Sequence, residues 1–448
     1  MAISTEAGIL AMLKTFYAKE GLVNLLYRND PLLKDIKKSR IEGKSANFSA
    51  LFSRGGAVSA NYLTAKRLAT QTAQAKEFAV TPGQLFSACV FNNKELLASK
   101  SLKGAYINVA SAKFFANAES FRKTLAVALY GSGHGELFTY AANAEDKIPV
   151  GGADSEQTFN FPKYAIMGID IGSELEIKNS ANATSVVNTL TVTKIDGTTV
   201  TAKIKTAVSG SPYALAGKVV CLAGCTDGSG NGLLPVGLAG WMPVGTISSS
   251  DNFYGVNRSE ARDRLAGTVI TAASGEKKYE AIERAILAVR RMGGIADKIV
   301  LNDEDYLDMA KELETKTYFP KTGKAKHDAA VGFEGFGFAV STSWVDNVID
   351  SPYCPKGVAY VLSSDTIELW TYTNADKIAD GIPGNEAGKP DVTGETDVQD
   401  KPYQLLVDDM FTVTPGTDTA DGAAALVALN FYGNFVITNP SCNAVVTF

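Results

Sequence analysis

The chain has 448 residues, of which 45% are hydrophobic and 20% are charged, a globular composition that excludes a disordered or fibrous protein. Its length suffices for about two to four domains. The formal charge of -5 argues against a protein that wraps nucleic acid directly, because phosphate binding requires a basic surface. No apolar run approaches the about 20 residues that span a bilayer, and the start "MAISTEAGIL" lacks a signal core, so we expect a cytosolic protein without a membrane partner.

The first apolar pattern along the chain predicts a helical arm. Residues 5–28 place apolar side chains, Phe16 and Leu26 among them, on stripes that are interrupted at Gly21. Pro31 restricts the residue before it to an extended conformation and ends the helix. We therefore expect an amphipathic arm that is broken at the glycine.

A long polar stretch follows the arm. Residues 43–75 are small, polar and basic, lack core periodicity, and are too numerous for an ordinary connection within a compact domain. Residues 76–91 then alternate partly between apolar and polar side chains, as a strand does. Together the two stretches predict a long two-stranded flap that contacts another surface.

The middle of the chain changes from a helical pattern to strand patterns. Apolar residues recur at helical spacing over residues 107–130, and "GSGHG" ends this helix at Gly131. Residues 165–225 contain short β-branched runs and turn dipeptides such as Asp196-Gly197, typical of a small β domain. The glycine-rich "TDGSGNGLLPVGLAGWMPVG" predicts a linker, after which α/β patterns resume, so we expect the β domain to be inserted.

The last part of the chain predicts a helix followed by strands. "EKKYEAIERAILAVRRMGG" places Tyr279, Ile282, Ile286 and Val289 on one helical face. "GVAYVLSSDTIELWTY" is strand-like, and residues 375–401 form a loop of glycine, proline and acids. "ALVALNFYGNFVITNPSCNAVVTF" returns to strands, which gives an α+β architecture overall.

The acidic stretch "RRMGGIADKIVLNDEDYLDM" is the main candidate for a chemical site. "DKIVL" predicts a buried strand, and Asn302 is a favoured N-cap residue for the next helix. Asp303, Glu304 and Asp305 then fill the first turn, where the helix dipole stabilises an acid by about 0.3 to 1 kcal/mol. Apolar residues interrupt the alternation of acids that a calcium loop requires, so we expect only a helix start. Asparagine at both aspartates should then cost little stability, whereas an enzyme would lose turnover.

The remaining polar motifs do not match catalytic or cofactor sites. "EGKS" has Lys38 where a phosphate loop needs its first glycine, and "GSGHG" follows a helix, whereas a phosphate cradle precedes one. No nucleophile pattern surrounds His134 or His327. The five cysteines include one close pair, Cys221 and Cys225, too few for a disulfide framework or a four-ligand zinc site. We therefore expect no catalysis, metal or cofactor.

The order of these elements resembles the major capsid proteins of tailed bacteriophages, which share the Hong Kong 97 shell fold. "LLYRNDPLLKDIKKSRIEGKSANFSALFSRGGAVSANY" is similar to their arm and extended loop, and "LLASKSLKGAYINVASAKFFANAESFRKTLAVALYGSGHGEL" to their spine helix and its glycine-rich exit. "GLAGWMPVGTISSSDNFYGVNRSEARDRLAG" looks like the segment before the axial-domain helix, and "GNFVITNPSCNAVVTF" like the usual ending. The resemblance spans most of the chain.

The resemblance implies an α+β fold of the Hong Kong 97 type with an inserted small β-barrel-like domain. The implied parts are an N-terminal helical arm (1–42), an extended loop (43–78), a peripheral domain with the spine helix (79–160), the inserted β domain (161–232), an axial domain (233–375), and an acidic loop with C-terminal strands (376–448). In such shells the arm and extended loop reach over neighbouring subunits, and the axial domain packs at the centre of the capsomer.

The implied function is that of a major capsid protein, not an enzyme. Such a protein assembles with itself into pentamers and hexamers of an icosahedral shell, in the host cytoplasm, and encloses double-stranded DNA in the virion without sequence-specific binding. Its further partners are a portal protein and, in some members, scaffolding and decoration proteins. The side chains expected at contacts between subunits are Phe16, Leu26, Arg54, Lys66, Arg67, Arg290 and Arg291. The last two also suit the end of a helix, where the dipole favours cations.

Two rival interpretations stay open beside the enzyme. An encapsulin, a cellular compartment shell with the same fold, would load enzyme cargo rather than a genome. The inserted β domain and the acidic loop favour a phage protein instead. A surface-binding protein could use the β domain as its recognition module, and this role is compatible with a shell.

Overall fold

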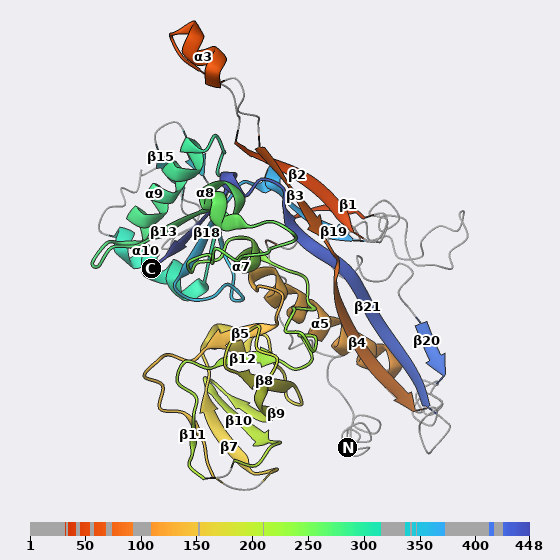
Figure 1. Ribbon diagram of the computed structural model, residues 1–448. Coiled ribbons are helices and arrows are strands. Elements are labelled where there is room, and N and C mark those ends of the chain that lie inside the picture. The colour runs from red at the N-terminus through yellow and green to blue at the C-terminus, as the bar shows by residue number, and fades with distance from the viewer. Residues whose placement is uncertain are drawn as a thin grey trace, which may run out of the picture. The chain divides into compact units, whose positions relative to one another are not determined.

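The computed structural model combines helices with several β-sheets (Figure 1). It describes residues 32, 35–41, 45–53, 58–68, 74–92, 109–150, 153–208, 210–314, 337–340, 343–345, 347–371, 412–415 and 424–448. These residues fall into two compact units. The larger unit comprises the described parts of Asp30–Gly83, Val127–Tyr372 and Gly433–Phe448, and the smaller unit those of Gln84–Ala126 and Thr373–Tyr432.

A five-stranded sheet organises the core of the larger unit. Its order is β13-β22-β18-β14-β17, with β13 beside β22 and β14 beside β17 parallel and the other neighbours antiparallel. The strands are β13 (Thr268–Thr271), β22 (Ala444–Thr447), β18 (Val358–Leu362), β14 (Lys298–Leu301) and β17 (Asn347–Asp350). The C-terminal strand therefore pairs with segments far away in sequence, and the predicted strands at the end of the chain are confirmed.

The predicted helices on both sides of β14 are confirmed. Helix α9 (Lys278–Arg291) buries Ile282, Ile286 and Val289 in one apolar cluster with sheet residues such as Ile299. The predicted apolar face is thus the face that packs against the sheet. Helix α10 (Asp303–Glu314) starts directly after β14.

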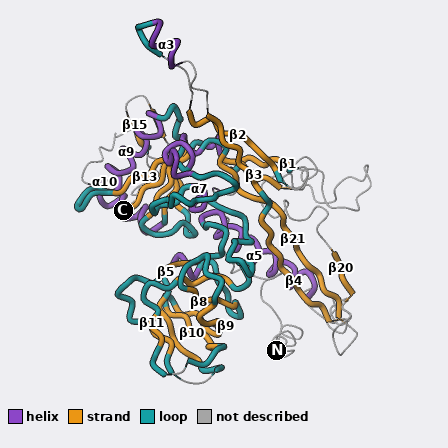
Figure 2. Tube along the Cα trace, viewed as in Figure 1, coloured by secondary structure: helices purple, strands orange, loops and turns teal. Residues whose placement is uncertain are grey.

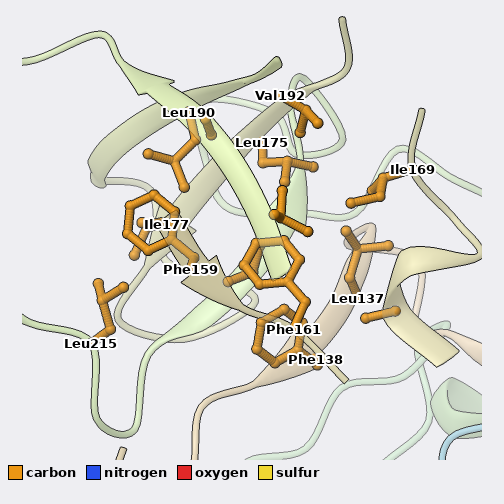
Figure 3. Close-up of a cluster of buried hydrophobic side chains, with 14 of the residues drawn as sticks. Leu137, Phe138, Phe159, Phe161, Ile169, Leu175, Ile177, Leu190, Val192 and Leu215 are labelled. Carbon is orange, nitrogen blue, oxygen red and sulfur yellow. The ribbon is translucent and has the colours of Figure 1, made fainter. Parts of the chain in front are cut away.

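A second, six-stranded sheet lies in the β-rich middle of the chain, where strands and loops dominate (Figure 2). In sheet order its strands are β5 (Glu136–Thr139), β12 (Val219–Leu222), β8 (Glu174–Lys178), β9 (Val186–Asp196), β10 (Thr199–Ile204) and β7 (Glu156–Asn160). Side chains such as Phe138, Phe161 and Leu175 form its buried core (Figure 3). Because β5 and β7 precede residue 161, the sheet begins earlier than the sequence pattern indicated; both strands are short and poor in β-branched residues.

The predicted two-stranded flap is present. Strand β2 (Ala46–Ser53) pairs antiparallel with β3 (Gln74–Val80), in a register that sets Phe48 opposite Phe78. A short helix, α3 (Tyr62–Leu68), lies in the connection between the two strands (Figure 1).

The glycine-rich segment after the β domain is packed, and the expectation of a linker is wrong. Trp241 is fully buried, and its indole Nε1 donates a hydrogen bond to the Phe435 carbonyl at 2.7 Å. A Cβ on Gly237 would lie 2.1 Å from the Leu129 carbonyl oxygen, so the backbone approaches this helix end more closely than a side chain permits. The glycines therefore allow close packing here rather than flexibility.

In the smaller unit, the long predicted helix is confirmed as α5 (Val109–Tyr130), whose residues up to Ala126 belong to this unit. Strand β4 (Gly83–Asn92) pairs with β21 (Ala424–Ile437), which also pairs with β20 (Thr412–Pro415). Within the unit, the Ser87 hydroxyl donates a hydrogen bond to Asn117 Oδ1 at 2.5 Å.

The shorter elements complete the described part of the chain. They are β1 (Lys37–Arg40), which pairs with β19 (Ile367–Thr371), β6 (Lys147–Ile148), which pairs with β11 (Tyr213–Ala214), β15 (Phe338–Val340), which pairs with β16 (Ser343–Val345), and the short helices α6 (Lys163–Ile166), α7 (Leu238–Trp241), η1 (Arg258–Ala261), α8 (Arg262–Leu265), η2 (Ser364–Thr366) and η6 (Pro440–Cys442). The predicted arm with Phe16 and Leu26, the candidate Arg54, His327, most of "EGKS" and the acidic loop at 375–401 lie outside the described residues.

Candidate functional site

The flap carries large apolar side chains that its own chain leaves exposed. Val58, Tyr62 and Leu63, in and before α3, are 99%, 77% and 73% exposed, and Leu51 on β2 is 62% exposed. Single exposed apolar residues are ordinary on a protein surface. Several of them on one projection are typical of a contact surface for another molecule.

Local bonds hold the short helix of the flap in shape. The Asn61 side chain accepts hydrogen bonds from the backbone N–H groups of Leu63, at 2.9 Å, and Thr64, at 3.3 Å, which caps the helix start. Lys66 and Arg67 occupy the last turn and are exposed, where cations complement the helix dipole. The flap therefore presents apolar and basic side chains together.

An aromatic cluster anchors the other end of the flap. Phe48 and Phe78 stack across the two strands with ring centroids 5.1 Å apart. Trp241 lies 5.6 Å from Phe78, and Trp370 packs edge-on against Phe48 at 5.9 Å. Because such contacts bury large apolar areas, the root of the flap belongs to the body of the larger unit.

Polar contacts reinforce this anchor. Lys76 on β3 forms an ion pair with Glu260 at 2.9 Å, and the Arg264 guanidinium donates a hydrogen bond to the Phe52 carbonyl. Between the strands, the Asn47 amide donates a hydrogen bond to Glu77 at 2.9 Å. The β2–β3 strands are thus held as far as Phe52, whereas the flap is exposed toward α3, an arrangement suited to contacting another molecule.

The structure places the sequence-predicted contact residues on separate elements. Arg290 and Arg291 are exposed in the last turn of α9, beside the exposed Met292, whereas Lys66 and Arg67 lie on α3. Within the flap, the sequence predicted contacts only for the basic residues Arg54, Lys66 and Arg67, and not for its apolar side chains. The sequence does carry a signal for these apolar side chains, because residues such as "YL" stand inside a polar, aperiodic stretch.

The acidic stretch forms a network of structural ion pairs. Asn302 caps α10, because its Oδ1 accepts a hydrogen bond from the Glu304 N–H at 3.0 Å. Asp305 is buried; its Oδ1 contacts Lys278 Nζ at 2.8 Å, and its Oδ2 accepts a hydrogen bond from the Gly357 N–H at 2.6 Å. Burial lowers the pKa of Lys278, but its bonds to carboxylates outweigh this effect and raise it overall. The predicted helix start is confirmed, and the carboxylates also tie α10 to α9 and to the loop before β18.

Glu304 makes two further ion pairs, with Lys356 at 2.7 Å and Lys163 at 3.0 Å. Hydrogen bonds from these two lysines lower the pKa of Glu304 to about 2. A carboxylate with a lowered pKa stabilises the fold fully above its unfolded pKa of about 4.3, and this stabilisation is lost as the pH falls toward 2. We expect the difference in unfolding free energy between the wild type and Glu304→Gln to shrink over that interval, measured by urea unfolding. A constant difference would contradict the assignment of these pairs.

The other polar groups that the structure describes show no arrangement specific to catalysis. The Ser132 hydroxyl lies 2.8 Å from His134 Nδ1, in the turn that ends α5, and this histidine is half-buried. Burial raises the pKa of the Cys221 and Cys225 thiols to about 12, which disfavours the reactive thiolate. Among the described residues, no group of three or more His, Cys, Asp and Glu side chains is placed to hold a metal ion. None of the described helices is long and apolar enough to cross a membrane.

Comparison with known proteins identifies the fold. No protein-family model and no curated protein matches the chain. Among solved structures, it is similar to a chain of the capsid asymmetric unit of cyanophage A-1(L), with a TM-score of 0.54 and 12% identity over 97% of this chain and 96% of that chain. The chain has the fold of this phage capsid chain. The resemblance seen in the sequence is confirmed at the level of the fold.

Two weaker likenesses have lower scores and add nothing to this assignment. The holo-SrpI encapsulin complex from Synechococcus elongatus has a TM-score of 0.44 and 8% identity, over 100% of this chain and 96% of that chain. Mycobacterium phage Bobi has a TM-score of 0.43 and 10% identity, over 100% of this chain and 99% of that chain.

Proposed function

We propose that the chain is a major capsid protein that assembles with copies of itself into the pentamers and hexamers of an icosahedral phage shell around double-stranded DNA. The capsid fold supports this role. The observation that carries it is the flap, whose root is anchored in aromatic packing and whose exposed Tyr62 and Leu63 are left for another surface. In a shell, one such contact is repeated at every subunit.

The parts of the chain receive roles in the same proposal. The β2–β3 flap is the extended loop over a neighbouring subunit, α5 is the spine helix, and the sheet with α9 is the axial domain at the capsomer centre. The six-stranded sheet is the inserted domain, which would begin near Glu136 rather than residue 161. Arg290 and Arg291 remain candidates for contacts around the capsomer. The protein acts as a structural component, not an enzyme.

The charge of the chain supports enclosure of DNA rather than tight binding to it. A net charge of -5 gives weak repulsion toward phosphate, which would not oppose packaging or ejection of a genome. The proposed partners are other copies of the chain, a portal protein, and scaffolding or decoration proteins. The assembled protein would be part of the virion.

The test is negative-stain electron microscopy of the purified chain, alone and co-expressed with its neighbouring genes. Closed shells, capsomer rings or tubes are expected. Shells with the diameter of a genome container support the phage role, whereas small shells that copurify with an enzyme would favour a cargo compartment. A monomer under both conditions would contradict any shell role.

A further inference from the structure

Tyr254 has a backbone conformation that a bulky side chain rarely adopts. Its φ is 49°, in the left-handed region, and the one other described non-glycine residue with positive φ is Asp154. Aspartate tolerates this region, whereas an aromatic residue there is a true outlier. Such a conformation persists only where the surrounding structure holds it.

The contacts of the Tyr254 side chain supply that restraint. Its ring lies 4.6 Å from the ring of Phe253 and 5.8 Å from Trp241, measured between centroids. Its hydroxyl, in a part-buried position, accepts a hydrogen bond from the Asn434 side-chain amide. The Arg258 guanidinium lies 3.9 Å from the Phe253 ring and bonds both oxygens of Asp251, which closes the turn.

Tyr254 and Asn434 also bond to the strand that returns from the flap. The Ala79 N–H donates a hydrogen bond to the Tyr254 carbonyl at 3.0 Å, and Asn434 Nδ2 donates another to the Thr81 carbonyl at 2.9 Å. Asn434 Oδ1 accepts a third from the Val236 N–H at 2.7 Å. Tyr254 and Asn434 are therefore bonded to the flap root and to each other, and Asn434 is also bonded to the segment of Val236.

The residues that follow in the root are packed too closely against another segment for the chain to shift along it. A Cβ on Gly83 would lie 2.5 Å from the Pro235 nitrogen, so the chain passes backbone against backbone at this point. The aromatic anchor formed by Phe48 and Phe78 is apolar and tolerates small rotations, whereas the bonds at Tyr254 and Asn434 are directional. The polar contacts consequently constrain the direction of the flap more closely than the aromatic packing does alone.

We infer that Tyr254 and Asn434 form a latch that fixes the orientation of the flap. A change of Tyr254 from its left-handed conformation would withdraw its carbonyl from Ala79 and its hydroxyl from Asn434 together. One residue would thereby remove both contacts at once, while the aromatic packing and the Lys76–Glu260 ion pair would still hold the two strands. The inference concerns the single chain and does not depend on the proposed shell role.

Hydrogen–deuterium exchange on the full-length, unassembled chain tests the latch. Tyr254→Phe removes the phenol hydroxyl and retains the ring, and amides of β2 and β3 should exchange about two- to tenfold faster, the effect of one lost hydrogen bond. Asn434→Ala removes three bonds and should accelerate them more. Amides of β9 and β10 should be unchanged in both variants.

Tyr213→Phe is the matched control. The Tyr213 hydroxyl makes a 3.4 Å contact with Asn179, away from the flap, so this variant should leave exchange in β2 and β3 unchanged. Unaltered exchange of β2 and β3 in both latch variants would overturn the inference. Equal acceleration of β9 and β10 would overturn it as well, because it would indicate a global loss of stability.

Discussion

Replacing Tyr62 and Leu63 together with aspartate should abolish assembly of the chain without unfolding it. Each large apolar side chain that becomes buried at a contact stabilises it by about 1.5 to 3 kcal/mol. Loss of both should raise the protein concentration needed for shells more than about a hundredfold. Aspartate in the first turn suits the helix dipole, so α3 itself should persist.

Electron microscopy and sedimentation velocity measure assembly, and thermal unfolding measures the stability of the chain. The matched control is Ile171→Asp, because Ile171 is also highly exposed, at 69%, but lies in the turn before β8 of the six-stranded sheet. This control should assemble as the wild type does. Shells of the double variant at wild-type concentrations would show that the exposed side chains of the flap are not a contact surface.

Replacing Asp305 with asparagine should destabilise the chain by about 3 kcal/mol, the usual cost of breaking a buried ion pair. The Asp305 side chain is 2% exposed and contacts Lys278, whose remaining carboxylate partner, Asp308, is 47% exposed. Asparagine lacks the charge that compensates the lysine. The sequence alone suggested only a small loss of unfolding free energy. Because this carboxylate is buried, the expected loss is larger.

Asp303→Asn is the matched control on the same helical turn. Asp303 is exposed, so its replacement should change the unfolding free energy by only about 0.5 kcal/mol. Urea unfolding of both variants at neutral pH gives the comparison. Equal losses for the two variants would show that the Lys278 pair adds nothing to stability.

In the acidic stretch, neighbouring residues were enough to predict the helix start but not the ion pairs. Asn302 and the acids after it suffice to predict a helix start, because capping and the dipole depend only on neighbouring residues. The partners of those acids, Lys278 and Lys356, are 25 or more positions away and could not be inferred from spacing. Which carboxylate is buried therefore depended on how α9 and the loop before β18 pack against α10.

The glycine-rich composition after the β domain predicted a linker where the structure has close packing. The segment that contains Gly237 and Gly240 has the composition of a linker, yet it lies against the end of α5 with Trp241 fully buried. Glycine permits both flexible connections and close backbone contact, and sequence composition does not separate these uses. The partner segment decides which of them applies.

The sequence by itself determined the helices at 109–130 and 278–291, the existence of a flap, and the order of elements that resembles a capsid protein. Periodicity and turn chemistry act over a few residues, so a single chain displays them directly. Only the tertiary structure decided that Tyr62 and Leu63 stay exposed while Phe48 and Phe78 are held against Trp241. All four are apolar residues of one flap, and their burial depends on segments more than 150 residues away, because the hydrophobic effect depends on which surfaces meet rather than on their distance along the chain.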